Sequence, residues 1–85
     1  MNSVYEHTIL HVTDAKYLDG YEIWLKFDDG CEGIVDLENQ LEGEVFGPLK
    51  DLGLFKSFGI DGGTIVWRNG RNFAPEFLYK NMKRY

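Results

Sequence analysis

Four glycine-containing turns constrain this chain more than any other feature of its sequence. They lie at Asp19-Gly20, Asp28-Asp29-Gly30, Asp61-Gly62-Gly63 and Asn69-Gly70. Glycine adopts the positive φ angles that tight hairpin turns need, and Asp-Gly and Asn-Gly pairs are typical of such turns. Because short apolar segments flank these turns, the sequence predicts short antiparallel strands joined as hairpins.

The segment Tyr21–Phe27 alternates apolar and polar residues, which predicts a strand with one buried face. A two-residue loop after it would set apolar residues opposite charged ones. A three-residue loop over Asp28–Gly30 keeps apolar residues together on one face, so this register is predicted. The predicted pairs are Phe27 with Cys31, Ile23 with Val35, Tyr21 with Leu37, Trp24 with Ile34 and Lys26 with Glu32.

Further elements are expected on both sides of this hairpin. Residues 8–17 alternate loosely and predict a first strand. The acidic stretch Glu38–Glu44 has neither a helical nor a strand period, so we expect a solvated loop. Gly47-Pro48 then begins a short helix, because proline suits the first helical position. The residues expected to pack this helix on the sheet are Leu49, Leu52 and Phe55.

The last third of the chain predicts a second hairpin and a second helix. The turn at residues 61–63 joins two apolar segments, and we expect it to be built like the first hairpin. Pro75 begins a C-terminal helix. Its buried face is expected to hold Leu78, Met82 and Tyr85, and its exposed face a charge ladder of Glu76, Lys80 and Arg84. We therefore predict a single α+β domain over residues 1–85: an antiparallel sheet with a short middle helix and a C-terminal helix packed on it.

The charge is divided unevenly along the chain. Residues 1–67 hold thirteen acidic residues and four lysines, a net charge of −9, whereas residues 68–85 have a net charge of +4. Binding to duplex nucleic acid depends on many basic groups, so the acidic body argues against a nucleic-acid partner. The chain has one cysteine and no apolar run of the roughly 20 residues that a membrane helix needs, and its first residues lead us to expect no signal peptide. We expect a cytoplasmic protein without a membrane partner.

No combination of residues predicts catalysis or metal binding. His7 and His11 are four residues apart, a spacing that places both on one side of a strand, but a zinc site needs about three or four ligands, and only Cys31 and scattered carboxylates could complete it. Cys31 faces Phe27 in the predicted register, which favours a place in the core. Adjacent acidic residues such as Asp28-Asp29 are explained by turn formation. We therefore expect no enzyme, no metal and no cofactor.

Two parts of the sequence are candidate interaction surfaces. One is the turn flanked by Trp67, Arg68, Arg71 and Phe73, because tryptophan and arginine are enriched in the centres of protein interfaces. In the alternative interpretation, Trp67 and Phe73 pack the last helix on the sheet, which a chain with so thin a core favours. The other candidate is the acidic hairpin and loop, with Asp28, Asp29, Glu32, Glu38, Glu42 and Glu44.

The favoured function is a protein-interaction module with either a basic protein partner or a second copy of the chain, since an acidic body attracts a basic protein. Two alternatives remain open. One is a small enzyme or ligand-binding protein with a pocket near His11, Cys31 and Trp67. The other is a nucleic-acid contact through the basic C-terminal helix.

Several short motifs follow one another in a distinctive order: F-D-D-G at 27–30, V-D-L at 35–37, F-G-P-L-K-D at 46–51, T-I-V-W-R-N-G at 64–70 and A-P-E-F-L-Y at 74–79. This order resembles the bacterial family catalogued as domain of unknown function 2442. The resemblance implies a small α+β fold with a curved antiparallel sheet and no established activity. It also implies a gene that often lies beside that of a second small protein, as in toxin–antitoxin pairs. Asn72 stands where family members often carry aspartate, which argues against a chemical role for a carboxylate there.

Overall fold

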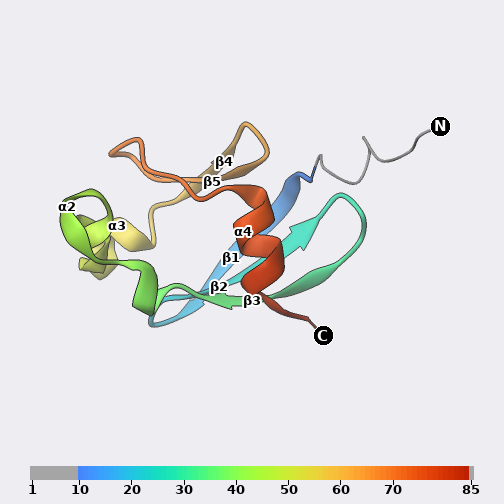
Figure 1. Cartoon of the computed structure of the whole chain (residues 1–85), viewed down its shortest axis with the longest axis horizontal. Coiled ribbons are helices and arrows are strands. Elements are labelled where there is room, and N and C mark those ends of the chain that lie inside the picture. Colours follow the sequence, from blue (N-terminus) through green and yellow to red (C-terminus); the bar gives the residue numbers. More distant parts are fainter. Residues whose placement is uncertain (1–9, 85) are drawn as a thin grey trace.

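The computed structural model describes residues 10–84, which form two antiparallel sheets and several short helices (Figure 1). The larger sheet has the strand order β1-β2-β3-β6, and the smaller one pairs β4 with β5, so the predicted α+β class is confirmed. The strands are β1 (Val12–Asp19), β2 (Glu22–Phe27), β3 (Glu32–Asp36), β4 (Gly59–Asp61), β5 (Thr64–Val66) and β6 (Lys83–Arg84). The α-helices are α2 (Gly43–Phe46), α3 (Leu52–Phe55) and α4 (Pro75–Asn81), and the 3-10 helices are η1 (Glu38–Gln40) and η2 (Gly47–Lys50).

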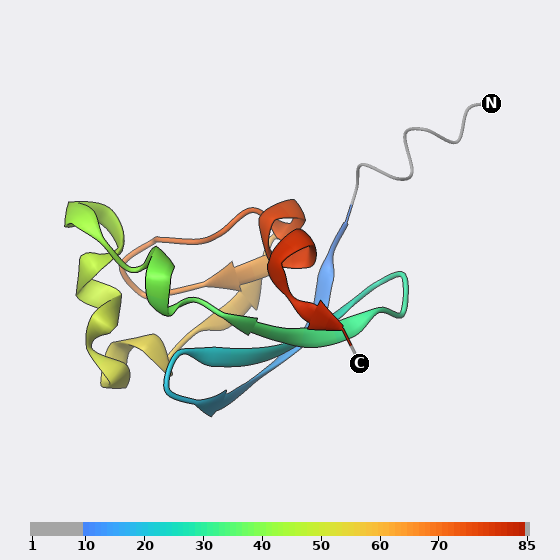
Figure 2. The ribbon, with the colours of Figure 1, turned by 60° about the horizontal axis from the view of Figure 1, so that its bottom comes forward.

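Helix α4 and the β4–β5 hairpin lie on one side of the four-stranded sheet, while the short helices gather at one end of the molecule (Figures 1 and 2). The hydrophobic core fills the space between these two layers. The opposite face of the sheet carries exposed and half-buried side chains. The buried apolar residues are Val12, Ile23, Leu25, Phe27, Val35, Leu37, Leu41, Leu49, Phe55, Ile65, Trp67, Phe73, Leu78 and Met82.

The first hairpin has the predicted register. Ile23 pairs with Val35, and the backbone N–H of Phe27 donates to the carbonyl of Cys31 at 2.9 Å. Gly30 has a φ of 89°, and its N–H donates to the Phe27 carbonyl, as in a three-residue loop that closes with a left-handed glycine. The alternation of apolar and polar residues was therefore sufficient to select this register.

The turn at residues 68–70 has the same construction as the turn at residues 28–30. In both, the glycine has a positive φ and its N–H donates to the carbonyl of the residue before the turn. In both, the side chain of the middle residue, Asp29 or Asn69, accepts a hydrogen bond from the N–H two residues later. The two loops are thus the same turn in different places.

The turn at residues 61–63, which we expected to be built like the first hairpin, is different. Asp61 pairs with Thr64, which leaves a two-residue loop of Gly62 and Gly63. Both glycines have positive φ angles, as a type I′ turn requires. The second glycine therefore allows a loop that is one residue shorter than the loop of the first hairpin.

The stretch Glu38–Glu44 is not the solvated loop that its composition predicted. It contains η1 and the start of α2. Leu41 within it is fully buried in the core. One apolar residue thus anchors this otherwise acidic stretch to the body of the molecule.

The middle helix is divided into short pieces. Asp51 is extended, with φ −67° and ψ 112°, and its side chain accepts a hydrogen bond from the N–H of Gly53 at 3.1 Å. It therefore caps α3 and separates this helix from η2, because an aspartate satisfies the free N–H groups at a helix start. Leu49 and Phe55 are buried as predicted, but the prediction for Leu52 is wrong, since it is 40% exposed.

The C-terminal helix begins at Pro75 as predicted, but it ends at Asn81. Met82 is extended, with φ −76° and ψ 149°, and the chain then forms β6. The predicted charge ladder is therefore wrong in its last member, because Arg84 lies on a strand. No helix among residues 10–84 is long and apolar enough to cross a membrane.

Strand β6 lies against β3, with Arg84 opposite Gly33 and Lys83 opposite Ile34. The approach is close: a Cβ atom on residue 33 would lie 2.6 Å from the carbonyl oxygen of Lys83. Only glycine fits at position 33 without moving the C-terminal strand. This pairing places the side chain of Arg84 beside the first hairpin.

The first strand differs from its predicted span of residues 8–17. Strand β1 continues to the glycine turn, and its pairing with β2 is irregular at Thr13 and at Leu18, each of which is an extra residue. Such bulges protect an edge strand from pairing with another chain. The predictions for residues 8 and 9, for His7 and for Tyr85 lie outside the described residues.

Candidate functional site

The turn after β5 is one of the two expected contact surfaces, but the two aromatic residues that flank it belong to the core. Trp67 is 2% exposed, and its indole N–H donates to the carbonyl of Phe55 at 2.8 Å. Phe73 is 8% exposed, and its ring meets that of Trp67 edge-on with centroids 5.9 Å apart. These two side chains offer little surface to a partner, so burial supports the alternative in which they pack the core. Arg68 and Arg71 are exposed, and their contact with a partner stays a prediction.

A polar cluster joins the first hairpin turn to α4. The hydroxyl of Tyr79 donates to Oδ2 of Asp29 at 2.7 Å and lies 3.4 Å from Sγ of Cys31. Oδ1 of Asp29 accepts a hydrogen bond from the backbone N–H of Cys31 at 2.9 Å. The Tyr79 ring contacts Phe27 edge-on, and the guanidinium of Arg84 lies 4.5 Å from its centroid. We call Asp29, Cys31, Tyr79 and Arg84 the tyrosine cluster.

These hydrogen bonds fix the charges within the tyrosine cluster. The backbone N–H of Cys31, and then the hydroxyl of Tyr79, hold the pKa of Asp29 below its ordinary value of 3.8. The contacts with Cys31 and with Asp29 stabilise the neutral phenol and raise the pKa of Tyr79. At neutral pH the carboxylate therefore stays charged and the phenol stays protonated. Neither group has a pKa near neutral pH, as efficient proton transfer requires, so the cluster is best suited to holding the first hairpin turn against α4.

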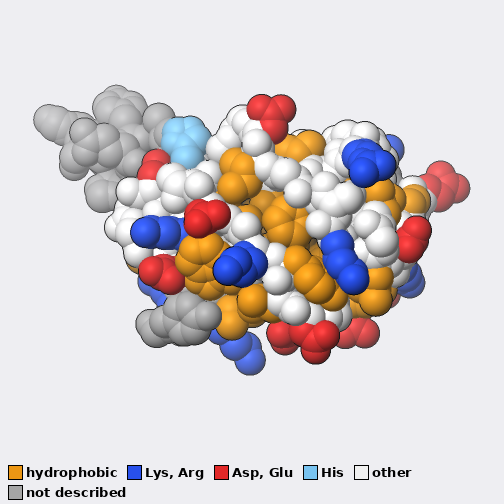
Figure 3. Space-filling view, turned by 180° about the vertical axis from the view of Figure 1, so that it is seen from behind, with side chains coloured by type: hydrophobic (Ala, Val, Ile, Leu, Met, Phe, Trp, Pro, Cys, Tyr) orange, Lys and Arg blue, Asp and Glu red, His pale blue; other side chains and the backbone are white. Residues whose placement is uncertain are grey.

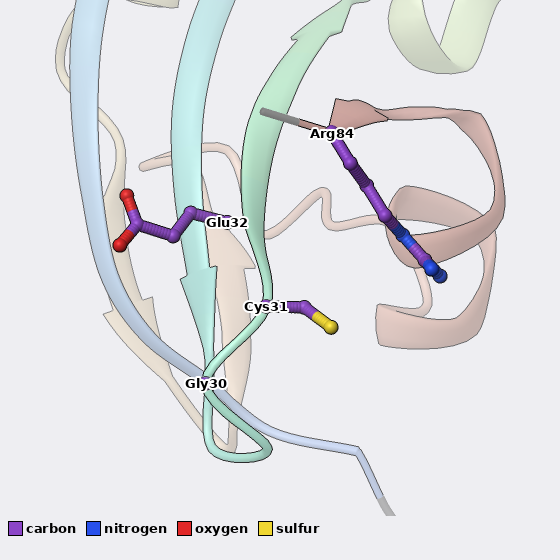
Figure 4. Close-up of a pocket in the computed structure, with 4 residues that line it drawn as sticks. All are labelled: Gly30, Cys31, Glu32 and Arg84. Carbon is purple, nitrogen blue, oxygen red and sulfur yellow. The ribbon is translucent and has the colours of Figure 1, made fainter.

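A pocket of about 300 Å³ opens beside the tyrosine cluster. Its lining residues are Gly30, Cys31, Glu32 and Arg84. Figure 4 shows the side chains of Cys31 and Arg84 on the same side of β3, whereas Glu32 points to the other side. Neither His11 nor Trp67 lines this pocket. The three residues that the enzyme alternative requires are therefore not gathered there.

His11 pairs with Asp28 at the edge of the molecule. Nδ1 of His11 lies 3.2 Å from Oδ2 of Asp28, and the two side chains are 51% and 39% exposed. Solvent screens such a pair, so it contributes little to stability. In the part of the chain that the structure describes, no three His, Cys, Asp or Glu residues are grouped so that they could hold a metal ion.

The other expected contact surface is one continuous part of the chain. Between Asp28 and Glu44 there are seven acidic residues and no lysine or arginine. Six of the seven are exposed, and Glu32 is half-buried. Among residues 10–84, the ion pair of Asp28 with His11 is the one that involves this segment. We call Asp28, Asp29, Glu32, Asp36, Glu38, Glu42 and Glu44 the acidic segment.

The sheet face opposite α4 carries an ordered row of side chains. The pairing of the four strands places Lys16, Trp24, Ile34 and Lys83 in one row across the sheet. Trp24 and Ile34 are half-buried and the two lysines are exposed. The indole N–H of Trp24 donates to Oε1 of Glu32 at 3.2 Å, which orients the ring. Figure 3 shows apolar side chains gathered on this side of the molecule with charged ones around them.

The next row along the same face is acidic. Glu22 lies directly opposite Asp36 in the pairing of β2 with β3. Like charges in directly opposed positions destabilise a sheet. A pocket of about 250 Å³ opens at this row. Its lining residues are Glu22, Ile34, Asp36, Asn81 and Lys83.

Sequence reasoning missed the tyrosine cluster and the acidic row. Local sequence patterns do not indicate the contacts of Tyr79, because its partners Cys31 and Asp29 are 48 and 50 residues away along the chain. The register that the sequence predicted already placed Trp24 beside Ile34 on the outer face, which was the available signal for an apolar surface there.

Comparison with known proteins identifies a family. The family model described as "Protein of unknown function (DUF2442)" matches residues 12–84, nearly the whole chain. No curated protein and no solved structure matches this chain.

Proposed function

The chain belongs to the DUF2442 family, whose description assigns no activity, and we propose that it is a protein-interaction module that binds a small basic protein. The observation that carries this proposal is the acidic segment, in which seven acidic residues follow one another without an intervening lysine or arginine. Such a surface speeds association with a basic partner by electrostatic steering. The same charge would oppose the approach of a second acidic copy.

The form of the edge strand β1 favours a partner that contacts a face of the sheet over one that adds a strand to it. Strand β1 has bulges at Thr13 and Leu18, and it exposes Asp14 and Lys16 between them. Bulges and charges are the usual protection of a sheet edge against strand addition. A partner is therefore expected to meet side chains of the acidic segment.

We extend the proposal to an antitoxin-like role in the cytoplasm, in which the module binds and neutralises the product of an adjacent gene. The gene arrangement that the family resemblance implies and the lone cysteine support this extension. The charge states of the tyrosine cluster, which do not suit proton transfer, support a role without catalysis.

Co-expression with the product of the adjacent gene tests the proposal. We expect the two proteins to purify together at about 50 mM salt and to separate at about 500 mM, because salt screens exposed charges. A triple variant of the acidic segment should weaken the complex, and a matched triple variant with the same change in net charge should not. The segment variant is Glu38→Gln/Glu42→Gln/Glu44→Gln, and the control is Asp19→Asn/Asp61→Asn/Glu76→Gln. Separate purification of the two proteins at low salt would contradict the proposal.

A further inference from the structure

We infer that the outer face of β2 and β3 binds an extended segment of the partner protein in which an apolar residue and a basic residue are two positions apart. This inference rests on the proposed function and names the part of the molecule that the partner contacts. The surface consists of the apolar pair Trp24–Ile34 and the acidic pair Glu22–Asp36, which we call the two-row surface.

Among residues 10–84, no helix or strand lies over the apolar row (Figure 2). Trp24 and Ile34 are half-buried on the face opposite α4, and exposed lysines, Lys16 and Lys83, continue the row on both sides. The hydrogen bond from Trp24 to Glu32 holds the indole in one orientation. A pre-oriented tryptophan is a typical anchor of a protein interface, because little side-chain entropy remains to be lost on binding.

The acidic row determines the charge of the occupant. Glu22 and Asp36 oppose one another directly, although this arrangement costs stability. Lys83 lines the same pocket, yet among residues 10–84 no ion pair within 4 Å joins it to either carboxylate. A cationic side chain that entered this pocket would relieve the repulsion between the carboxylates and complement their charge.

The spacing of the two rows determines how far apart the apolar and the basic residue of the bound segment must be. Trp24 is two residues from Glu22 on β2, and Ile34 is two residues from Asp36 on β3, so the rows are about 7 Å apart. Residues i and i+2 of an extended peptide point to the same side with this same separation. An apolar-x-basic segment aligned with the strands therefore reaches both rows at once.

The probe for this inference is the blocked tripeptide acetyl-Leu-Gly-Arg-amide, titrated into the full chain labelled with nitrogen-15. We expect saturable chemical-shift changes at the Trp24 indole N–H and at the backbone amides of Glu22, Ile34 and Asp36. Acetyl-Leu-Gly-Glu-amide should cause no such changes. The absence of changes with the arginine peptide, or equal changes with both peptides, would overturn the inference.

A double variant with a matched control locates the binding. In the variant Glu22→Gln/Asp36→Asn, the apparent Kd for the arginine peptide should rise roughly fivefold. The same substitutions should also raise Tm, since they remove the like-charge pair, and this readout establishes that the variant folds. Glu38→Gln/Glu42→Gln has the same change in net charge and should leave the Kd unchanged. Equal losses of peptide affinity in both variants would overturn the inference, because they would mean that the peptide is attracted by net charge alone.

The two proposals can fail separately. If the adjacent-gene product binds and Glu22→Gln/Asp36→Asn leaves its affinity unchanged, the two-row surface is wrong while the interaction function stands. If the arginine peptide binds at this surface and the adjacent-gene product does not bind, the proposed function fails. Sedimentation velocity tests a second copy as occupant: a dimer that Glu22→Gln/Asp36→Asn disrupts would overturn the inference of a basic partner.

Discussion

The hydroxyl of Tyr79 affects the charge of its neighbour Asp29. It donates to Asp29 and thereby contributes to the lowered pKa of that carboxyl. In Tyr79→Phe the pKa of Asp29 should rise towards its ordinary value of 3.8, and the free energy of unfolding should fall. An NMR pH titration of the side-chain carboxyl of Asp29 measures the first effect. Tyr17→Phe serves as the control, and an unchanged pKa in Tyr79→Phe would contradict this assignment.

The two shifted pKa values also define pH windows of stability. The pKa of Asp29 is lowered in the folded state, so its stabilising effect is present above pH 3.8 and is lost as the pH falls through the folded-state pKa. The pKa of Tyr79 is raised, so its effect is present below pH 10.0 and is lost as the pH rises above that value. Chemical unfolding of the wild type and of Tyr79→Phe across pH should give curves that converge at both extremes. A constant difference across the whole range would be inconsistent with this linkage.

For Trp67, the composition of the surrounding sequence did not distinguish an interface residue from a core residue. Its neighbours Arg68 and Arg71 suggested an interface, but the indole is buried and donates to the carbonyl of Phe55. Trp67→Ala should lower the free energy of unfolding by about 3–5 kcal/mol, because it leaves a cavity in a thin core. Denaturant unfolding followed by circular dichroism measures this loss. A change below about 1 kcal/mol would contradict the assignment of Trp67 to the core.

At the scale of elements, the turns were more predictable than the helices. Glycine positions and strand alternation are local signals, and they were sufficient for the first hairpin and its register. The break at Asp51 comes from a local cap, because its side chain accepts from the N–H of Gly53 two residues later, whereas the strand at Lys83–Arg84 depends on a tertiary pairing with β3 that no local pattern contains. The tyrosine cluster was missed for the same reason, since it joins residues from the first hairpin and the last helix.

The C-terminal strand depends on the glycine opposite it. In Gly33→Ala the new Cβ would lie 2.6 Å from the carbonyl oxygen of Lys83, so β6 should detach, and the free energy of unfolding should fall by about 1 kcal/mol. Faster hydrogen exchange at the amides of residues 83 and 84 would report the detachment. Gly59→Ala is a matched control, because nothing lies within 4 Å of the added atom and Gly59 has no positive φ. Unchanged exchange in Gly33→Ala would mean that β6 tolerates the methyl group.

Across the whole molecule, the residues that build the fold differ from those that carry the surface charge. The buried aromatic residues and the turn glycines build the fold, whereas the residues of the acidic segment and of the two-row surface are exposed or half-buried. The sequence predicted the acidic surface directly, since charge is visible in composition. The opposition of Glu22 and Asp36 was missed, although it follows from the predicted register that pairs Ile23 with Val35.

The association rate constant of the adjacent-gene product, measured at several salt concentrations, tests the central claim most directly. If an acidic surface attracts a basic partner, the rate should fall by roughly tenfold between about 50 mM and about 500 mM salt. The variant Glu38→Gln/Glu42→Gln/Glu44→Gln should associate more slowly than wild type at low salt and at the same rate at high salt. A rate that does not change with salt, or no association at any salt concentration, would contradict the account.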